Sequence, residues 1–170
     1  VYYGNHERQL IEGWIPAAVK NLEGHEYHTS MTWETLDAIK EIGGLPFILK
    51  GVATAEDAAL AVEHGVQAVY VSNHGGRQLD HTRACIDALP EVVDAVDGRV
   101  PVVVDGGFMR GADVVKGLCL GADVVGMGRL QGLAMAAGGG PALARASEIV
   151  AREIQTSLAL LGLHKLADLN

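Results

Sequence analysis

The stretch Val69-Tyr70-Val71-Ser72-Asn73-His74-Gly75-Gly76-Arg77-Gln78-Leu79-Asp80 decides how the rest of the chain is interpreted. It begins with an apolar, β-branched run and stops at a polar cluster, which is typical of a buried strand followed by a turn. Two adjacent glycines just past the run permit positive φ angles and a close approach of the backbone to a ligand. We therefore expect His74 and Arg77 to lie on a sharp turn at the mouth of a strand.

His74 and Arg77 offer two complementary kinds of chemistry. An imidazole exchanges a proton near neutral pH, and a guanidinium presents a planar fork that fits a carboxylate or a phosphate. Loops at strand ends carry sites more often than cores do, which favours a functional interpretation. The alternative is a tight turn with a surface arginine and no further role.

The composition is that of one ordinary α/β domain. The chain has 170 residues, of which 49% are apolar and 5% aromatic, as in parallel α/β proteins with a sizeable core. The net charge of −8 argues against a protein that binds nucleic acid or an anionic membrane. A small anionic substrate stays open, because the local placement of arginine decides its binding.

The cysteines and the hydropathy pattern predict a cytoplasmic protein. Cys85 and Cys119 are far apart and form no C-x-x-C pattern, so we expect two free thiols in a reducing compartment. Neither a signal peptide nor an apolar stretch near 18 residues is evident, so no membrane association is expected. The first residue, Val1, is not Met, which favours processing, truncation or partial coverage of a longer product.

Residues 1–31 are interpreted as a loop-rich lead-in, separate from the unit formed by residues 32–170. Pro16 begins a short expected helix that ends at Lys20. Three histidines in the segment are irregularly spaced and lack a Cys or carboxylate partner motif, so solvated loop histidines are preferred and no metal is expected. They are His6, His25 and His28.

After the lead-in, strand and helix signals alternate along the chain. The expected strands cover 46–49, 66–71, 101–104 and 124–127. The expected helices cover 32–43, 54–65, 82–97 with a kink or restart at Pro90, 111–120, and a long amphipathic tail from Pro141.

One pentapeptide, Gly-Ala-Asp-Val-Val, occurs twice, at 111–115 and at 121–125. Local propensity cannot distinguish identical pentapeptides, so the flanking residues must do so. The first copy continues into a helical pattern and is expected to be helical. The second leads into Gly126-Met127-Gly128-Arg129 and is expected to be a strand.

Four successive strand-helix units predict a parallel sheet with right-handed crossovers. The distinctive polar residues all follow strands, at the end where parallel α/β proteins bind ligands. Four units amount to half of an eight-stranded barrel. The polar residues are Lys50, His74, Arg77, Asp105 and Arg129.

The last two strand ends have the residues of a phosphate site. Asp105-Gly106-Gly107 precedes a helix whose N-terminal amides are suited to an anion, and Gly126-x-Gly128-Arg129 adds amides and a cation. No G-x-G-x-x-G or Walker A pattern is present, which leaves Rossmann and P-loop interpretations little support. The alternative is that these glycines serve only strand-helix packing.

Residues 72–80 resemble, without a break, the signature of the FMN-dependent 2-hydroxy-acid oxidising enzymes. That family includes glycolate oxidase, lactate oxidase, mandelate dehydrogenase and flavocytochrome b2. Three further motifs resemble the family in the same order, and the likeness runs from about residue 31 to the C-terminus. They are Leu45-Pro46-x-x-Leu49-Lys50-Gly51-Val52, Asp105-Gly106-Gly107 and Gly128-Arg129.

The resemblance implies a (β/α)8 TIM barrel, FMN as cofactor, and a role for each matching residue. His74 is implied as the base that takes a proton from the substrate, whether a carbanion forms or a hydride moves. Arg77 is implied as the fork that holds the substrate carboxylate, and Lys50 as the cation beside flavin N1 and O2. The other implied flavin contacts are Ser72, Asp105, Gly106, Gly107, Met109, Arg110, Gly128 and Arg129.

Two positions depart from the family pattern. Arg-Arg is common where this chain has Met109-Arg110, and the first of that pair usually meets the FMN phosphate. Met109 lacks the charge for that contact, so either Arg110 replaces it, or backbone amides and Arg129 suffice. Leu130 stands where Pro is frequent, so the identity of the substrate should not be taken from the well-known members.

The resemblance also implies that the chain holds only strands five to eight of the barrel. We therefore expect a complementary N-terminal half-barrel segment as partner, with self-association as the alternative and a homo-oligomer of the whole barrel as the assembly. The leading interpretation is oxidation of a 2-hydroxy acid to a 2-oxo acid, by an oxidase or a dehydrogenase. The alternative is a non-catalytic half barrel that binds phosphate or FMN, or serves as a scaffold.

Overall fold

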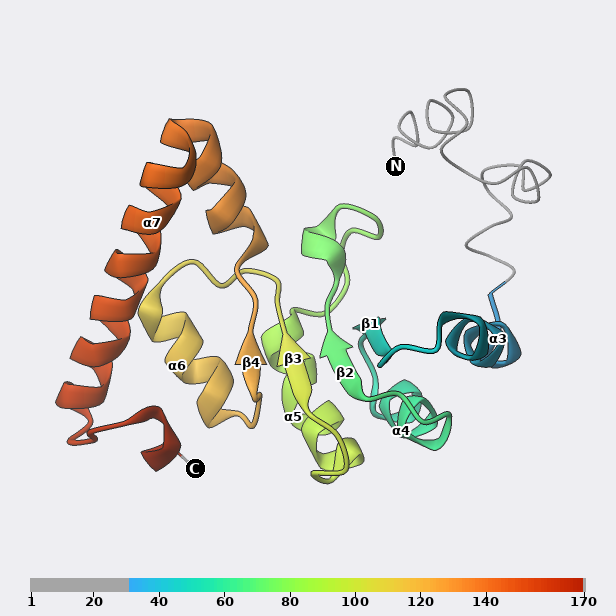
Figure 1. Cartoon of the computed structure of the whole chain (residues 1–170). Coiled ribbons are helices and arrows are strands. Elements are labelled where there is room, and N and C mark those ends of the chain that lie inside the picture. Colours follow the sequence, from blue (N-terminus) through green and yellow to red (C-terminus); the bar gives the residue numbers. More distant parts are fainter. Residues whose placement is uncertain (1–30, 170) are drawn as a thin grey trace. The chain divides into compact units, whose positions relative to one another are not determined.

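Four short parallel strands form one sheet in the order β1-β2-β3-β4 in this computed structural model, which describes residues 31–169 (Figure 1). The strand order follows the chain, as the alternating strand and helix signals predicted. The lead-in, with its short helix from Pro16 and its three histidines, lies outside the described residues. The strands are β1 (Ile48–Val52), β2 (Ala68–Val71), β3 (Val102–Val104) and β4 (Val124–Val125).

A helix follows each strand, and α4, α5 and α6 cover one face of the sheet. Figure 1 shows α5 behind β2 and β3, and the two sides meet through buried apolar residues such as Leu89 and Val92. The strand residues that face them alternate with half-exposed ones, as expected for a sheet with one covered face. The helices are α4 (Ala55–Glu63), α5 (Cys85–Val96), α6 (Gly111–Cys119) and α7 (Gly128–Leu160), with short 3-10 turns at η2 (His74–Gly76) and η3 (Leu166–Asp168).

The other face of the sheet carries the polar residues of the site. Val69, Val71 and Val104 are at most 1% exposed on the covered face. Tyr70 lies between Val69 and Val71 in sequence, so its side chain points to the opposite, open face. Tyr70 pairs in register with Lys50 on β1 and with Val103 on β3, which places the three in one row across the sheet.

α3 (Trp33–Gly43) belongs to a separate compact unit that ends at Leu45, whereas the sheet belongs to the unit Pro46–Asn170. The predicted cap is confirmed, because the Thr32 hydroxyl accepts a hydrogen bond from the Thr35 amide. Gly44 ends the helix in the left-handed region, as the Gly-Gly pair predicted.

The first strand lies further along the chain than expected. It was expected over 46–49, with Lys50 as the next residue after the strand. Instead β1 runs over Ile48–Val52 and contains Lys50. The register shifts between Lys50 and Val52, and Gly51 has a φ of 107°. This bulge is accessible to glycine and keeps the strand paired beyond Lys50.

The helix predictions at Pro90 and at Pro141 have different outcomes. α5 begins at Cys85 and continues through Pro90, whereas a kink or restart was expected there. The buried side chains of Leu89 and Val92 on either side offset the hydrogen bond that proline lacks. The long C-terminal helix expected from Pro141 is confirmed by a helical segment over 140–160, but α7 (Gly128–Leu160) also includes an earlier segment over 128–137 that was not predicted.

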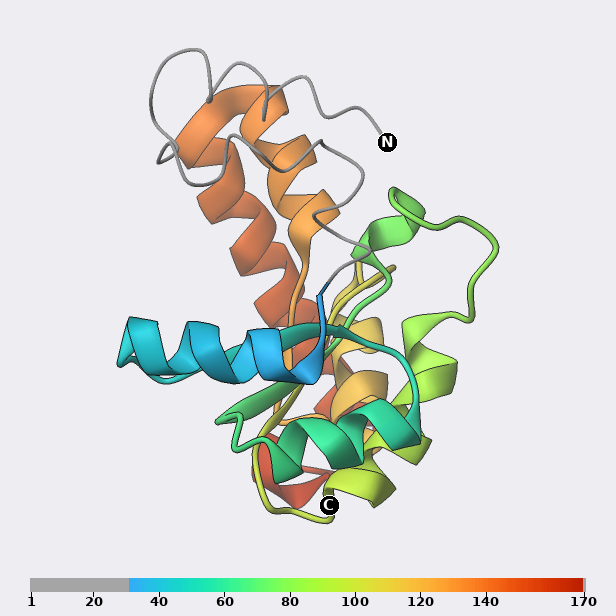
Figure 2. The ribbon, with the colours of Figure 1, turned by 90° about the vertical axis from the view of Figure 1, so that its right-hand side faces the viewer.

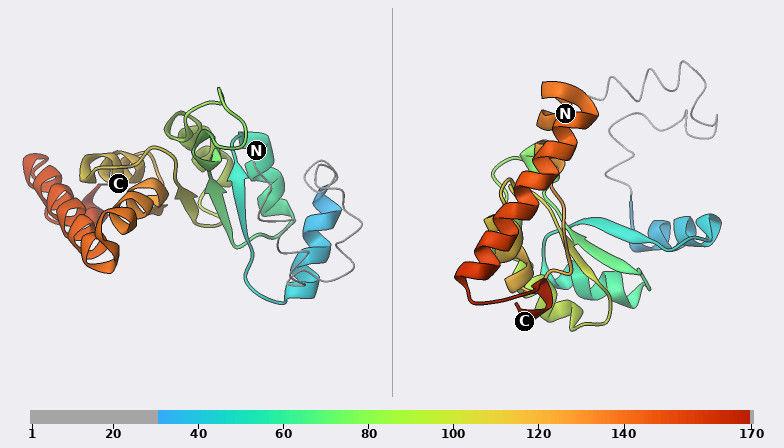
Figure 3. Two further views of the ribbon diagram at one scale, coloured as in Figure 1. Left: turned by 90° about the horizontal axis from the view of Figure 1, so that it is seen from above. Right: turned by 60° about the vertical axis from the view of Figure 1, so that its left-hand side comes forward.

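α7 consists of two helical segments. Gly138 and Gly139 leave the helical region, and Gly139 has a φ of 63° and a ψ of −148°, so the segments cover 128–137 and 140–160. The chain reverses direction between them (Figures 1 and 2). The second segment runs back alongside α6, which Figure 3 shows from two further sides.

The repeated pentapeptide adopts two structures, as the flanking residues predicted. Residues 111–115 open α6, and Val124 and Val125 of the second copy form β4. β4 is shorter than the predicted 124–127, because Met127 already precedes the first turn of α7.

Candidate active site at the carboxyl ends of the strands

The turn after β2 holds His74 in an unusual backbone conformation. His74, Gly75 and Gly76 have φ angles of 56°, 68° and 70°, all in the left-handed region. The Asn73 side chain supports the turn, because its Oδ1 accepts a hydrogen bond of 3.0 Å from the Gly75 amide. A left-handed residue that is not glycine costs about 1–2 kcal/mol, and such strain gathers at functional sites.

The His74 imidazole lies over Gly51 of β1. A Cβ on Gly51 would be 3.1 Å from His74 Cε1, so glycine both permits the bulge and leaves room for the ring. Desolvation, and then the positive charge of Lys50, lower the pKa of His74, while the Asp105 carboxylate partly opposes them. The imidazole is therefore neutral near pH 7 and able to accept a proton.

Lys50 connects the first three strand ends. Its Nζ donates a hydrogen bond of 2.7 Å to Ser72 Oγ and lies 3.4 Å from Asp105 Oδ2. Ser72 is 2% exposed, and its Oγ also accepts a hydrogen bond of 3.2 Å from the His74 amide. Positions that the sequence predicted as separate contacts thus form one network beneath His74.

Asp105 follows β3, and one of its carboxylate oxygens lacks a hydrogen-bond donor among the described residues. This oxygen, Oδ1, is buried. A buried acceptor without a donor costs about 1–3 kcal/mol, so the site fits a bound group that brings a hydroxyl or an N–H. A polyol chain such as the ribityl of a flavin has such donors.

The glycines after β3 and β4 shape the space next to Asp105. Gly106 has a φ of 93°, and a Cβ there would be 2.9 Å from Cys85 Sγ. Gly107 and Gly128 instead face open space, since no heavy atom lies within 4 Å of a Cβ built on either. Both backbones can therefore be approached closely by a ligand, as a phosphate group requires.

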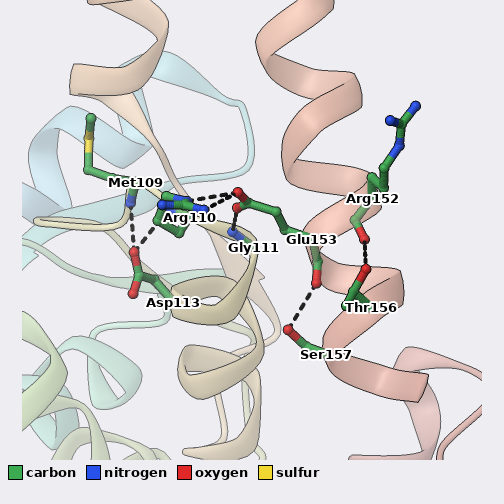
Figure 4. A network of polar contacts seen from close by, with 8 residues as sticks. All are labelled: Met109, Arg110, Gly111, Asp113, Arg152, Glu153, Thr156 and Ser157. Carbon is green, nitrogen blue, oxygen red and sulfur yellow. Dashed lines mark hydrogen bonds and ion pairs between the residues drawn. The ribbon is translucent and has the colours of Figure 1, made fainter. Parts of the chain in front are cut away.

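The first turn of α6 already has its acceptors, as Figure 4 shows. Asp113 Oδ2 accepts from the amides of Met109 and Arg110, at 3.1 and 2.9 Å. Glu153 of α7 accepts from the Gly111 amide at 2.7 Å and from Arg110 Nε at 2.8 Å. The sequence predicted that these amides would hold an anion, but in the structure they hold carboxylates of the chain itself.

Two arginines that were predicted to act in the site differ in their contacts. Arg129 Nη2 donates a hydrogen bond of 3.0 Å to the Gly75 carbonyl, which joins the start of α7 to the turn that carries His74. Arg77 is exposed on that turn, and its guanidinium has no partner within residues 31–169. Arg77 is thus free to meet a ligand at the mouth of the sheet.

Three contributors to the site escaped the sequence interpretation. Cys85 Sγ accepts a hydrogen bond of 3.1 Å from the Asn73 amide, and Tyr70 lies beneath Lys50. Glu153 comes from a helix more than 40 residues beyond Gly111. The sequence did offer a signal for Tyr70, because a phenol is unusual within a predicted buried strand. No local motif indicates that Cys85 or Glu153 contributes to the site.

Residues 31–169 contain no cluster of three or more His, Cys, Asp or Glu side chains that could hold a metal ion. No helix among them is long and apolar enough to cross a membrane.

Comparison with known proteins agrees with this geometry. The family of FMN-dependent dehydrogenases matches residues 8–170. The chain belongs to this family. Its four parallel strand-helix units are part of a (β/α)8 barrel, as the resemblance implied.

Several relatives of this chain are named as oxidases. The chain is 41% identical over 145 residues to an L-lactate oxidase of Nostoc sp., covering 85% of this chain and 40% of that protein. It is 47% identical over 142 residues to 2-hydroxyacid oxidase 2 of Homo sapiens, covering 84% and 40%. A solved structure of mandelate oxidase with benzoyl-formic acid superimposes with a TM-score of 0.77 at 40% identity, covering 82% of this chain and 42% of that one. The chain therefore spans less than half the length of these relatives.

Proposed function

We propose that this chain is the C-terminal part of an FMN-dependent enzyme that oxidises a 2-hydroxy acid to a 2-oxo acid. The observation that carries the proposal is the convergence of His74, Lys50 and Asp105 beside the unpaired Arg77 at the carboxyl ends of adjacent strands. The names of the relatives, which include lactate, glycolate and mandelate oxidases, support this reaction class.

Arg77 binds the substrate and His74 takes a proton from it. Arg77 holds the substrate carboxylate through its planar fork. A nitrogen of the neutral His74 imidazole takes a proton, from the substrate carbon or from its hydroxyl, as two electrons leave. FMN, when bound, accepts those two electrons.

Lys50, Ser72, Asp105 and the two strand-end glycine loops would hold the cofactor. The Lys50 ammonium supplies positive charge where the reduced cofactor becomes negative. The buried Asp105 Oδ1 would accept from a ribityl hydroxyl, and Gly106 leaves room for the Cys85 thiol and the Asn73 side chain behind it. Gly107, Gly128 and Arg129 would hold the phosphate. Met109 brings no charge, and Arg110 supports the loop through Glu153.

The partner is a complementary half-barrel segment. Within the described residues β1 and β4 each pair with one strand, and Ile48 and Val124 on these edges are 55% and 52% exposed. Exposed edges of a parallel sheet call for further strands. The chain covers 40% of the relatives named above, which leaves ample length for such a segment. The assembled barrel is proposed to form a homo-oligomer in the cytoplasm.

A second candidate function is a half barrel without catalysis, which only binds phosphate or FMN. It is favoured by the fact that no side chain among the described residues hydrogen-bonds the His74 imidazole, so the base lacks an orienting group there. A complementary segment that supplied such a group would remove the reason for this alternative.

The deciding experiment is a visible absorption spectrum of the purified protein, with intact mass to identify the chains present. Flavin bands together with a longer product or a second chain support the enzyme, and anaerobic bleaching by a 2-hydroxy acid then identifies the substrate. A protein that binds FMN but is not reduced by any 2-hydroxy acid supports the non-catalytic alternative. A stable monomer of this chain alone would contradict the partner proposal.

A further inference from the structure

The ring of Tyr70 forms the floor of the candidate site. The Lys50 Nζ lies 5.0 Å from the centroid of the ring, within reach of the negative charge on its face. Tyr70 pairs in register with Lys50 on the neighbouring strand, so backbone pairing brings the two side chains together on the open face. Lys50 then contacts Ser72 and Asp105 from this position.

The hydroxyl end of Tyr70 lies against the next two strand ends. A Cβ on Gly126 would be 2.6 Å from the Tyr70 Oη and 3.2 Å from Asp105 Cβ, so glycine is required for the phenol to fit. Desolvation, and then the charge of Asp105, raise the pKa of Tyr70. The phenol therefore stays protonated beside the carboxylate.

We propose that Tyr70 is a positioning residue, whose ring face fixes the Lys50 ammonium. Tyr70 touches neither the substrate nor the reacting atoms and acts through Lys50. It thereby sets where positive charge meets the cofactor, and this inference rests on the proposed function.

The reason is that Lys50 needs support on several sides. A lysine side chain loses up to about 2 kcal/mol of rotamer free energy when it is fixed. Ser72 Oγ and Asp105 Oδ2 hold the ammonium through polar contacts, and the aromatic face holds it from the third side. Without the ring the ammonium gains room to move, and its charge is less well placed.

The test compares two substitutions in the purified protein, with FMN binding measured by quenching of flavin fluorescence. Tyr70→Phe keeps the ring and should bind FMN within about twofold of the parent protein. Tyr70→Leu removes the ring and should bind FMN about three- to thirtyfold more weakly, as expected for the loss of a partly desolvated cation–π contact. Tyr70→Leu should also lower the reduction potential of the bound flavin, whereas a purely structural residue would leave the potential unchanged.

A double-mutant cycle shows whether Tyr70 acts through Lys50. In a Lys50→Met background, Tyr70→Leu should change FMN affinity by less than about twofold, because the ammonium that it positions is gone. Additive effects of the two substitutions would overturn the proposal, and so would a Tyr70→Leu protein equal to its parent.

Two further variants separate positioning from folding. Val103→Ala removes apolar volume from the register partner of Tyr70 on β3 and should leave FMN affinity and potential unchanged. If Tyr70→Leu does not fold, Tyr70→Met restores most of the volume without an aromatic face and should show the same loss of affinity. An unsubstituted protein that binds no FMN would overturn the proposed function itself, a result visible before any variant is made.

Discussion

At the scale of single residues, the strained turn at His74 concentrates the chemistry. A backbone in the left-handed region aims the imidazole over Gly51, and desolvation and then a neighbouring cation keep it neutral. The left-handed backbone costs about 1–2 kcal/mol, and strain of this kind is common at functional sites. The predictions at this scale therefore concern His74 and its neighbour on the turn, Arg77.

We predict that His74→Ala slows flavin reduction by about 10²- to 10⁴-fold, the usual contribution of a general base. FMN should remain bound, because the Lys50 and Asp105 contacts are untouched. Stopped-flow measurement of flavin bleaching checks this expectation. Unchanged reduction in a protein with full FMN content would show that His74 is not the base.

The pH dependence should follow the lowered pKa of His74. Activity requires the neutral imidazole, so it should hold down to below pH 6.5 and fall only where His74 becomes protonated. Lys50→Met removes a positive charge that lowers this pKa, so the acid limb of kcat/KM should move to higher pH. An acid limb that moves to lower pH in the variant would contradict the electrostatic argument.

Arg77→Lys should weaken substrate binding. The substitution keeps the charge and loses the bidentate fork, which is worth about 1.5–3 kcal/mol for a charged hydrogen-bond pair and amounts to roughly 10- to 100-fold in kcat/KM. Steady-state kinetics with the identified acid would measure it. A control is the exposed Arg145, which pairs with Glu148 on α7, and Arg145→Lys should leave kcat/KM unchanged.

At the scale of elements, the sequence predicted the strand-helix alternation and the side of the sheet that carries the site. It did so because periodicity and strand-end glycines are local signals, as the different fates of the repeated pentapeptide show. It missed the contacts made by residues distant in sequence. Arg110 pairs with Glu153 and Tyr70 with Lys50, and each partner comes from another element whose packing no local pattern describes. The first segment of α7, residues 128–137, was missed because glycine lowers the helix propensity of that stretch.

Packing between α6 and α7 should depend on the missing side chain of Gly111. A Cβ there would be 2.5 Å from Glu153 Cβ and 2.7 Å from the Val150 carbonyl, and backbone moves at a cost. Gly111→Ala should therefore lower the free energy of unfolding by about 1–3 kcal/mol.

Gly132 provides the matched comparison for Gly111. It is helical too, but nothing lies within 4 Å of a Cβ built there. Gly132→Ala should raise stability by about 0.5–1 kcal/mol through helix propensity. Thermal or urea unfolding of both variants measures the difference, and equal effects of the two would contradict the packing argument.

At the scale of the whole molecule, the sheet formed by residues 31–169 has two open edges. The edge residues Ile48 and Val124 are apolar and exposed, a combination that promotes pairing with other strands. Residues 46–170 produced alone should therefore self-associate, and Ile48→Lys should reduce that association. Light scattering at increasing concentration measures it. The effect should disappear when a complementary half barrel is present, since β1 is then paired.

The hydrogen bond between Arg129 and the Gly75 carbonyl ties the turn that carries His74 to a residue 54 positions later. During synthesis on the ribosome, that turn emerges well before the arginine that braces it. Contacts of such long sequence separation form late, since the intervening loop must close first. The nascent chain therefore acquires β1 to β4 and α4 to α6 before the turn at His74 is braced, and a ribosome-bound intermediate stalled before Arg129 would hold a folded sheet with an unbraced turn.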